Sequence, residues 1–144
     1  MAALRAGERL PQWHPDFPRE DDLGAAGLWQ DGDPWGPRSI VARGWVVGSI
    51  GFFGPPAPAP DDVPEAEVGF GLVPTGRGRG IVPEALAALL ALTDAAGVRV
   101  RASIAPENAP SLRVAAKLHF TDVRGTTEQG ELVFVRPLPS APRG

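Results

Sequence analysis

The chain has 144 residues, 22% of them charged, with a formal net charge of −3 and a sequence pI of about 5.3. This length suits one domain with a real apolar core. An acidic balance without a basic stripe disfavours binding to nucleic acid or to an anionic membrane. Because the chain has no cysteine, disulfides, thiolate nucleophiles and Cys-based metal sites are excluded.

The two histidines, His14 and His119, have no partner at metal-ligand spacing, so no metal site is expected. No apolar run reaches the roughly 18 residues that a membrane span needs. The first ten residues lack the apolar core of a signal peptide. The default expectation is therefore a cytoplasmic protein.

The first half of the chain predicts two short helices followed by a β-hairpin. One helix is expected to end near Leu10, and another to begin in the acidic run at Glu20, where carboxylates suit the helix dipole. Apolar alternation predicts a hairpin over residues 39–54 with its turn at 43–44. Prolines make residues 55–65 a loop that cannot be a central strand.

The second half predicts alternating strands and helices. A strand over 66–73 leads through a glycine-rich turn into a helix over 82–96, where Pro83 suits the first turn and Gly97 ends the helix. Beyond it we expect a strand, a helix and a closing hairpin, at 98–104, at 110–119 and around 126–129. This order predicts a mixed sheet with helices on its faces, α/β or α+β, in which the strand–helix–strand unit 66–104 is parallel.

The glycine-rich turn is the part of the sequence that points to a ligand. The stretch VPTGRGRGIVPEAL, residues 73–86, places three glycines and two arginines at the mouth of a helix. Free N–H groups and the helix dipole favour an anion there, and glycines let the backbone approach it. A Walker A loop is excluded because Ile81 and Val82 follow Gly80 in place of Lys and Ser/Thr. A dinucleotide fingerprint would need a third glycine and a downstream acid, which are absent.

Another pattern fits this turn. The sequence R-x-x-G-x-(G/A) after a strand resembles the acyl-CoA pyrophosphate loop of GNAT-type N-acetyltransferases, with Arg77, Gly80 and Val82 at the three defined positions. Val82 departs from the small residue usual there, which would narrow the approach of the phosphate. The strand EVGFGLVP before the turn also resembles the family's Glu-Ile-Gly-Tyr-x-Leu-x-Pro.

A later segment, PENAPSLRVAAKLHF, extends the resemblance. Its matches to the family are Asn108, Ser111, Lys117, Leu118 and Phe120. His119 replaces the usual glycine, and a structural or exposed role is favoured for it over that of a base. The three segments lie in the family's order over residues 46–124, nearest to the branch of ribosomal-protein N-terminal and small-amine acetyltransferases.

The resemblance implies the GNAT-like acyl-CoA N-acyltransferase fold, with a central mixed, mostly antiparallel sheet and helices on both faces. We expect one domain over residues 1–138, with its motifs in 46–124 and a flexible tail at 139–144. Relatives usually begin with a strand before the first helix. Either the true start therefore lies upstream, or the sheet lacks that edge strand.

The implied activity is transfer of the acetyl group of acetyl-CoA to a primary amine by direct attack on the thioester, without a metal. The acceptor would be a small-molecule or peptide amine, and a homodimer is one assembly that the resemblance allows. By resemblance, the residues that hold the cofactor are Leu72, Val73, Arg77, Gly78, Arg79, Gly80, Ile81, Val82 and Asn108.

The amine must lose a proton, which costs roughly 4–5 kcal/mol at pH 7 for a lysine-like amine and about 1 for an α-amine. The resemblance makes Glu67 the candidate base, although an exposed strand-end carboxylate is an equal reading. The chain has no tyrosine to act as general acid. Ser111 could donate a proton to the leaving thiolate, or it could simply cap its helix, which is slightly favoured.

Three further features leave alternatives open. The role of His14 is undecided, although its loop could border the amine pocket. The acids Asp16, Glu20, Asp21 and Asp22 could attract a cationic substrate, but a solvated helix start is favoured. Finally, the fold could bind acyl-CoA with little chemistry, or the turn could belong to a nucleotide-binding domain of another kind.

Overall fold

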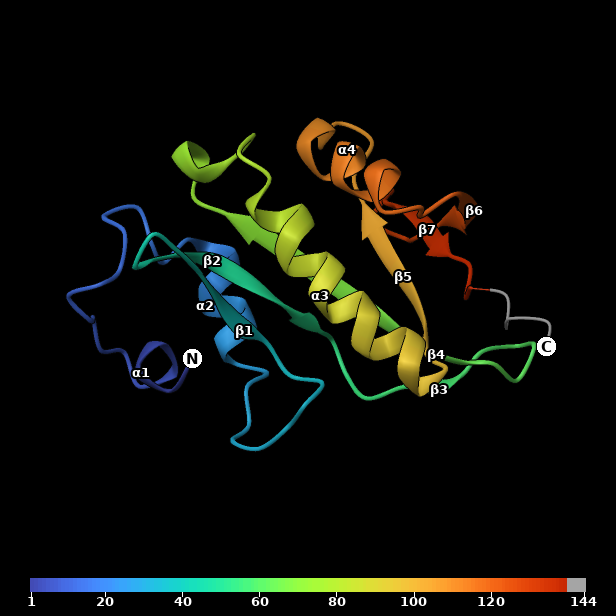
Figure 1. Cartoon of the computed structure of the whole chain (residues 1–144), viewed down its shortest axis with the longest axis horizontal. Helices are drawn as coiled ribbons and strands as arrows, with labels where there is room; N and C mark the ends of the chain where they lie inside the picture. The colour runs from blue at the N-terminus through green and yellow to red at the C-terminus, as the bar shows by residue number, and fades with distance from the viewer. Residues whose placement is uncertain (140–144) are drawn as a thin grey trace. The chain divides into compact units, whose positions relative to one another are not determined.

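The computed structural model describes residues 1–139 as two compact units. The first unit comprises Met1–Pro55 and Val68–Leu86, and the second comprises Pro56–Glu67 and the chain from Ala87 onward. The described residues form seven strands, four α-helices and one 3-10 turn (Figure 1). This is a mixed α/β fold with mostly antiparallel pairing, as the sequence predicts.

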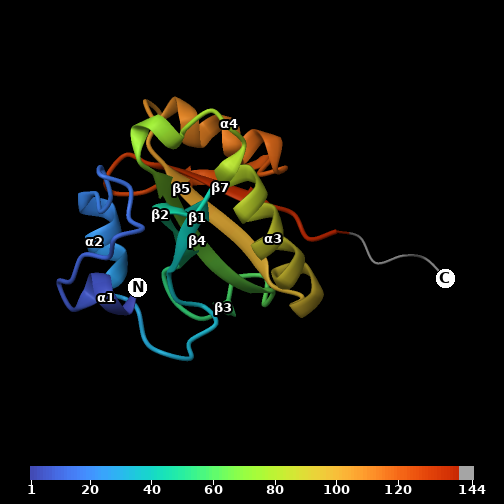
Figure 2. The same ribbon diagram turned by 60° about the vertical axis from the view of Figure 1, so that its left-hand side comes forward.

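The first unit is a three-strand antiparallel ladder in the order β1–β2–β4. Two short helices, α1 and α2, lie side by side next to it (Figure 2). Its elements are α1 (Ala2–Arg5), α2 (Glu20–Ala26), β1 (Arg38–Ala42), β2 (Trp45–Phe52), the later part of β4 (Pro64–Leu72), η1 (Pro74–Gly76) and the start of α3 (Ile81–Ala96).

The second unit contains the parallel pair. Strands β4 and β5 run parallel from Glu65 opposite Arg99 to Glu67 opposite Arg101, which confirms the predicted parallel unit. The antiparallel strands β7 and β6 continue beyond β5, and β3 pairs with β4. Its further elements are β3 (Ala57–Pro58), β5 (Arg99–Ile104), α4 (Ala109–Lys117), β6 (Asp122–Thr126) and β7 (Leu132–Arg136).

Apolar periodicity accounts for the core. The alternating positions 98, 100, 102 and 104 are all buried, and so is the leucine stripe of α3 at positions 86, 89 and 90. Gly97 has a φ of 69° and ends α3, as predicted. Two periodicities, of 2 and of 3.6 residues, thus account for the buried side chains of β5 and α3.

The boundaries differ from the expectations in two places. The first helix ends at Arg5 and not near Leu10, because Gly7 takes a φ of 78°, which an α-helix cannot contain. Within the expected loop 55–65, residues Ala57 and Pro58 form a two-residue strand at an edge, where proline is tolerated. Strand β4 also begins inside this range, at Pro64 and not at residue 66, because Pro64 and Glu65 pair with β3. Most of the tail expected to be flexible, 140–144, lies outside the described residues, and the single domain over 1–138 stays a prediction.

Glu65 lies in the middle of a cluster of charged side chains in the second unit. It is buried, yet it accepts hydrogen bonds from Arg99 (2.6 Å), Arg101 (2.8 Å) and both Nη atoms of Arg124 (2.6 Å each). Burial alone would raise the pKa of this carboxyl group. The three guanidinium groups outweigh burial and lower the pKa to about 2 from a usual 4.5. Since the arginines come from β5 and β6, the cluster ties those strands to β4.

The pH dependence of unfolding tests this cluster. A carboxyl group whose pKa is depressed on folding stabilises the protein above pH 4.5 and loses that contribution as the pH falls towards 2. We expect Glu65→Gln to lower the free energy of unfolding at pH 7 by about 1–3 kcal/mol, because a neutral amide replaces the buried carboxylate that accepts hydrogen bonds from three arginines. Urea titrations between pH 7 and pH 2 should show a flatter acid limb for this variant. The exposed Glu128→Gln is the control, and an equal change in both variants would contradict the assignment.

His119 follows Leu118, the C-cap residue of α4, and lies in the left-handed region with a φ of 68°. A side chain there costs roughly 1–2 kcal/mol, which glycine avoids. This backbone requirement explains why the family's glycine stands at this position. His119 is exposed, in agreement with the structural reading of this residue.

We expect His119→Gly to raise the free energy of unfolding by up to about 1 kcal/mol, since relieved strain is partly offset by the greater chain entropy of glycine. Thermal and urea unfolding measure this change. His119→Ala keeps the Cβ atom and serves as the control. A more stable Ala variant than Gly variant would refute the explanation by strain.

Candidate cofactor and acceptor site

The turn after β4 is fixed by backbone hydrogen bonds. The amide of Val73 donates to the carbonyl of Val47 (2.8 Å), which anchors the end of the strand. The amides of Gly76 and Arg77 then donate back to Val73 (3.0 Å) and Pro74 (3.2 Å), which forms η1. The chain leaves this turn through two left-handed glycines and enters α3 (Figure 1).

Five consecutive amides, those of residues 78–82, donate none of the hydrogen bonds of the described chain. The first helical bond of α3 runs from Glu84 to the carbonyl of Gly80, and Pro83 has no N–H group. Gly78 and Gly80 have φ values of 77° and 75°, and a Cβ at either would meet nothing within 4 Å. A run of free amides at a helix N-terminus, open to solvent and shaped by left-handed glycines, is an anion cradle.

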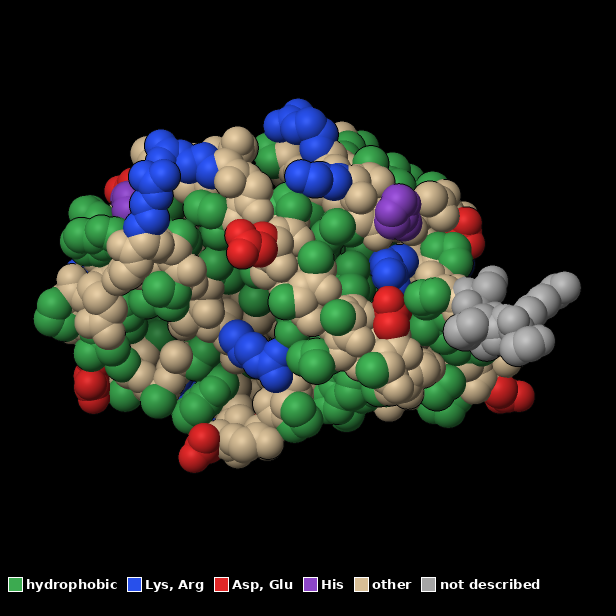
Figure 3. Space-filling model, in the orientation of Figure 1, with side chains coloured by type: hydrophobic (Ala, Val, Ile, Leu, Met, Phe, Trp, Pro, Cys, Tyr) green, Lys and Arg blue, Asp and Glu red, His purple; other side chains and the backbone are tan. Residues whose placement is uncertain are grey.

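Basic side chains accompany this cradle. Arg77 and Arg79 are exposed, and Figure 3 shows Lys and Arg side chains gathered over the η1 segment. The side chain of Val82 is buried (7% exposed), so most of its bulk packs inside the protein. The narrowing expected from Val82 therefore does not come from a side chain projecting into the mouth of the helix.

Strand β4 offers a second backbone feature. Its residues 65–67 pair with β5, whereas 68–72 pair with β2 and with no other strand of the described chain. The side chains of Leu72 and Val73 are buried. Main-chain groups on the second edge of β4 near Leu72 are thus available to an extended ligand, which could bind as another strand would.

In the second unit, Glu67 accepts a hydrogen bond from the Ser103 hydroxyl (2.9 Å) and lies 3.4 Å from Nε of Arg101. Its side chain is 26% exposed, so it is a held but accessible carboxylate. Such a group can take a proton if substrate approaches it.

The favoured cap reading of Ser111 is wrong. Asn108 caps α4, with its Oδ1 atom accepting from the amide of Ser111 at 3.3 Å, so Ser111 is the third residue of the helix and not its cap. The hydroxyl of Ser111 is therefore not used as the cap. Asn108 keeps its amide NH₂ group as a donor for a ligand.

A buried ion pair in the first unit was missed from the sequence. Arg19 holds Asp22 through Nε and Nη2, each at 2.9 Å, and Ser49 donates to the same carboxylate at 2.7 Å. Asp22 is completely buried, so the expectation of a solvated helix start is wrong for this residue, while its neighbours Glu20 and Asp21 are exposed. The Arg-x-x-Asp spacing was the available signal, but Ser49 joins from 27 residues away.

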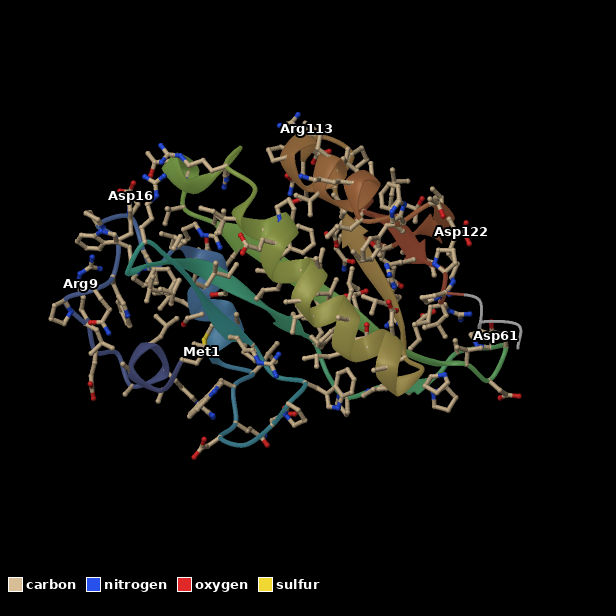
Figure 4. The ribbon with its side chains drawn as sticks, viewed as in Figure 1. Met1, Arg9, Asp16, Asp61, Arg113 and Asp122 are labelled. Carbon is tan, nitrogen blue, oxygen red and sulfur yellow. The ribbon has the colours of Figure 1, made fainter. Side chains whose placement is uncertain are left out.

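His14 joins the N-terminal segment to η1. Its Nδ1 accepts from the amide of Asp16 (3.0 Å), and its Nε2 lies 3.2 Å from the Thr75 hydroxyl. Figure 4 shows Asp16 beside η1. Since Nδ1 is an acceptor, Nε2 carries the proton and donates to Thr75. The role left open in the sequence is, in the structure, a link to the glycine-rich turn.

These features agree with comparisons to known proteins. The family model described as an acetyltransferase (GNAT) domain matches residues 2–121. The chain belongs to the GNAT acetyltransferase family. A putative GnaT-family acetyltransferase from Bordetella pertussis is 30% identical, over 79% of this chain and 72% of its own, with a TM-score of 0.58. The family expected from the sequence motifs is therefore confirmed.

Solved ribosomal-protein acetyltransferases are also similar to this GNAT domain. RimJ of Mycobacterium smegmatis, in complex with CoA-disulfide, is 25% identical over 69% of this chain and 51% of its own, with a TM-score of 0.56. The ribosomal L7/L12 α-N-protein acetyltransferase RimL shares the fold at 23% identity, over 66% and 56% of the two chains, with a TM-score of 0.54. The GNAT domain thus spans little more than half of either enzyme. No curated protein matches it by sequence.

None of the helices in residues 1–139 is long and apolar enough to cross a membrane.

Substitutions of Gly71 and Gly69 test how the pair of Arg19 and Asp22 packs against β4. A Cβ at Gly71 would lie 2.7 Å from the guanidinium nitrogens of Arg19, which Asp22 holds in place. We expect Gly71→Ala to lower the free energy of unfolding by about 1–3 kcal/mol. A Cβ at Gly69 would meet Phe53 at 2.8 Å, but that ring is exposed and can turn away. Urea unfolding of Gly69→Ala is the control, and equal losses would mean that Arg19 is not held.

Proposed function

We propose that this GNAT domain transfers the acetyl group of acetyl-CoA to a primary amine. The observation that carries the proposal is the run of five free amides at residues 78–82, flanked by Arg77 and Arg79. Such a cradle suits a pyrophosphate, because several N–H dipoles and two guanidinium groups can share its charge. The RimJ structure contains a CoA derivative, which supports the same class of cofactor here.

Three parts of the chain would hold acetyl-CoA. The amides of residues 78–82 and the two arginines would bind the pyrophosphate. The free edge of β4 at Leu72 and Val73 would pair with the pantetheine arm, and a main-chain N–H there would polarise the acetyl carbonyl. The NH₂ group of Asn108 would bond the pantetheine as well. No metal is needed, since the thioester is already activated.

The chemistry requires a neutral amine. Glu67 would take the proton, directly or through one water, as the amine nitrogen forms its bond to the carbonyl carbon. The carbon–sulfur bond then breaks and the thiolate leaves. The Ser111 hydroxyl, which is not used as a helix cap, would donate a hydrogen bond to that thiolate in place of the tyrosine that the chain lacks.

The acceptor in this proposal is a small-molecule or peptide amine, and the proposed compartment is the cytoplasm. The similar enzyme RimL, a ribosomal L7/L12 α-N-protein acetyltransferase, supports an α-amine of a protein as one case. A homodimer is the proposed assembly.

Thermal unfolding with acetyl-CoA, ATP and NAD is the first test. A ligand at about 100 times its Kd adds roughly 2.7 kcal/mol and should raise Tm by several degrees. A shift with acetyl-CoA alone supports the cofactor assignment, and thiol release with an amine panel then tests transfer. Binding without release from any amine would favour an acyl-CoA-binding module. A preference for ATP or NAD would overturn the proposal.

Gly80→Val should abolish acetyl-CoA binding, because a branched side chain with a positive φ both strains the turn and covers the amides. Isothermal titration measures this loss. Gly130→Val is the matched control, since Gly130 has a φ of 82° and open space around it, in the β6–β7 turn. Unchanged affinity in Gly80→Val would show that the cofactor does not use this loop.

A further inference from the structure

In the pair of Arg19 and Asp22, the carboxylate uses its hydrogen-bonding capacity more fully than the guanidinium group does. The carboxylate of Asp22 accepts four: from the amide, Nε and Nη2 of Arg19 and from Ser49. The guanidinium group has five N–H donors and uses two of them on Asp22. Nη1 donates none of the hydrogen bonds of the described chain and is not one of its buried unpaired atoms. The two N–H groups of Nη1, on a fixed and partly exposed guanidinium group, are thus available to a ligand.

Strand β4 has a glycine, Gly71, where the guanidinium group of Arg19 lies against it. Nη1 and Nη2 both lie 2.7 Å from the position of a Cβ at residue 71, so the guanidinium group rests directly on the backbone of Gly71. Ser49, which faces Gly71 across the β2–β4 ladder, fixes the carboxylate from the other strand. Any other residue at position 71 would displace the guanidinium group. The protein therefore holds Arg19 in one place on β4.

That place is next to the proposed reaction centre. Gly71 precedes Leu72, and consecutive Cα atoms are about 3.8 Å apart. The proposed function uses the backbone of Leu72 and Val73 for the acyl-pantetheine. A guanidinium group there is close enough to contact the molecule that attacks the thioester, and its planar fork suits a carboxylate.

We propose that Arg19 binds a carboxylate of the acceptor, so that the preferred acceptors are amines that also carry a carboxylate, such as free amino acids or peptides with an acidic residue near the amine. This inference rests on the proposed function. Asp22 balances the charge of Arg19, so the contact with the acceptor would be made by the N–H groups of the guanidinium that Asp22 does not use. The exposed carboxylates Asp16, Glu20 and Asp21 form no described ion pair with Arg19.

Matched acceptors isolate this contact. We would measure kcat and KM for β-alanine and β-alaninamide, and for glycine and glycinamide, with the wild type and with the double variant Arg19→Gln/Asp22→Asn. The double variant keeps a hydrogen-bonded pair without leaving a buried charge alone. The two amines of a pair differ in basicity, but this difference affects the wild type and the double variant alike. It therefore cancels when the ratio of their kcat/KM values is compared between the two proteins. The Kd for acetyl-CoA and Tm are measured in parallel.

We expect the preference for the carboxylate acceptor of each pair, measured as a ratio of kcat/KM values, to be at least about tenfold smaller in the double variant than in the wild type. The change should lie in KM, and the Kd for acetyl-CoA should stay the same. Arg19→Lys should retain part of the preference. Equal losses for both acceptors of a pair, an unchanged preference, or a weaker affinity for acetyl-CoA would each overturn the assignment.

A binding measurement separates this inference from the proposed function. Titrating β-alanine and β-alaninamide into the protein saturated with CoA reads the carboxylate contact without turnover. Preference for β-alanine, lost in the double variant, supports the role of Arg19 even if no amine is acetylated. Equal binding of both would overturn it, even if acetyl transfer is found.

Discussion

Strand β4 has different pairing along its length, and this constraint governs the candidate site. Over residues 65–67 it has a parallel partner in β5, and over 68–72 it pairs with β2 and with no other strand of the described chain. Backbone groups that a sheet would normally satisfy are thereby left for a ligand beside the glycine-rich turn. In the proposed function, main-chain atoms hold acetyl-CoA at least as much as side chains do.

Charged side chains are concentrated where β4 pairs with β5, whereas glycines recur in the part of β4 that pairs with β2. Glu65 and its three arginines fasten the start of β4 to neighbouring strands. Farther along, Gly69 and Gly71 lack side chains, and Phe53 and Arg19 cover them instead. A strand can present an aromatic ring and a cation from elsewhere in the chain only where it has no Cβ of its own.

Local patterns predicted much of this architecture. Alternation in β5, the leucine stripe of α3 and the glycine that ends it depend on near neighbours, so they are legible in the sequence. The run of glycines and arginines at 76–80 likewise pointed to an anion. The Glu65 cluster and the contact of Ser49 with Asp22 join residues 27 to 59 positions apart, and no periodicity announces them. Asn108 and Ser111 both suit a helix start, and only the backbone distinguished which residue caps α4.

Pro83 has a consequence for how anion binding to the glycine-rich turn can be observed. Because it contributes no N–H group, the free donors belong to residues 78–82 and are split between the two-glycine turn and the first turn of the helix. Amide hydrogens without an acceptor exchange with solvent far faster than those of a helix interior. An anion that engages them would slow exchange over five contiguous residues. Hydrogen exchange at residues 78–82, measured by mass spectrometry, would therefore show whether an anion is bound without a label on the protein.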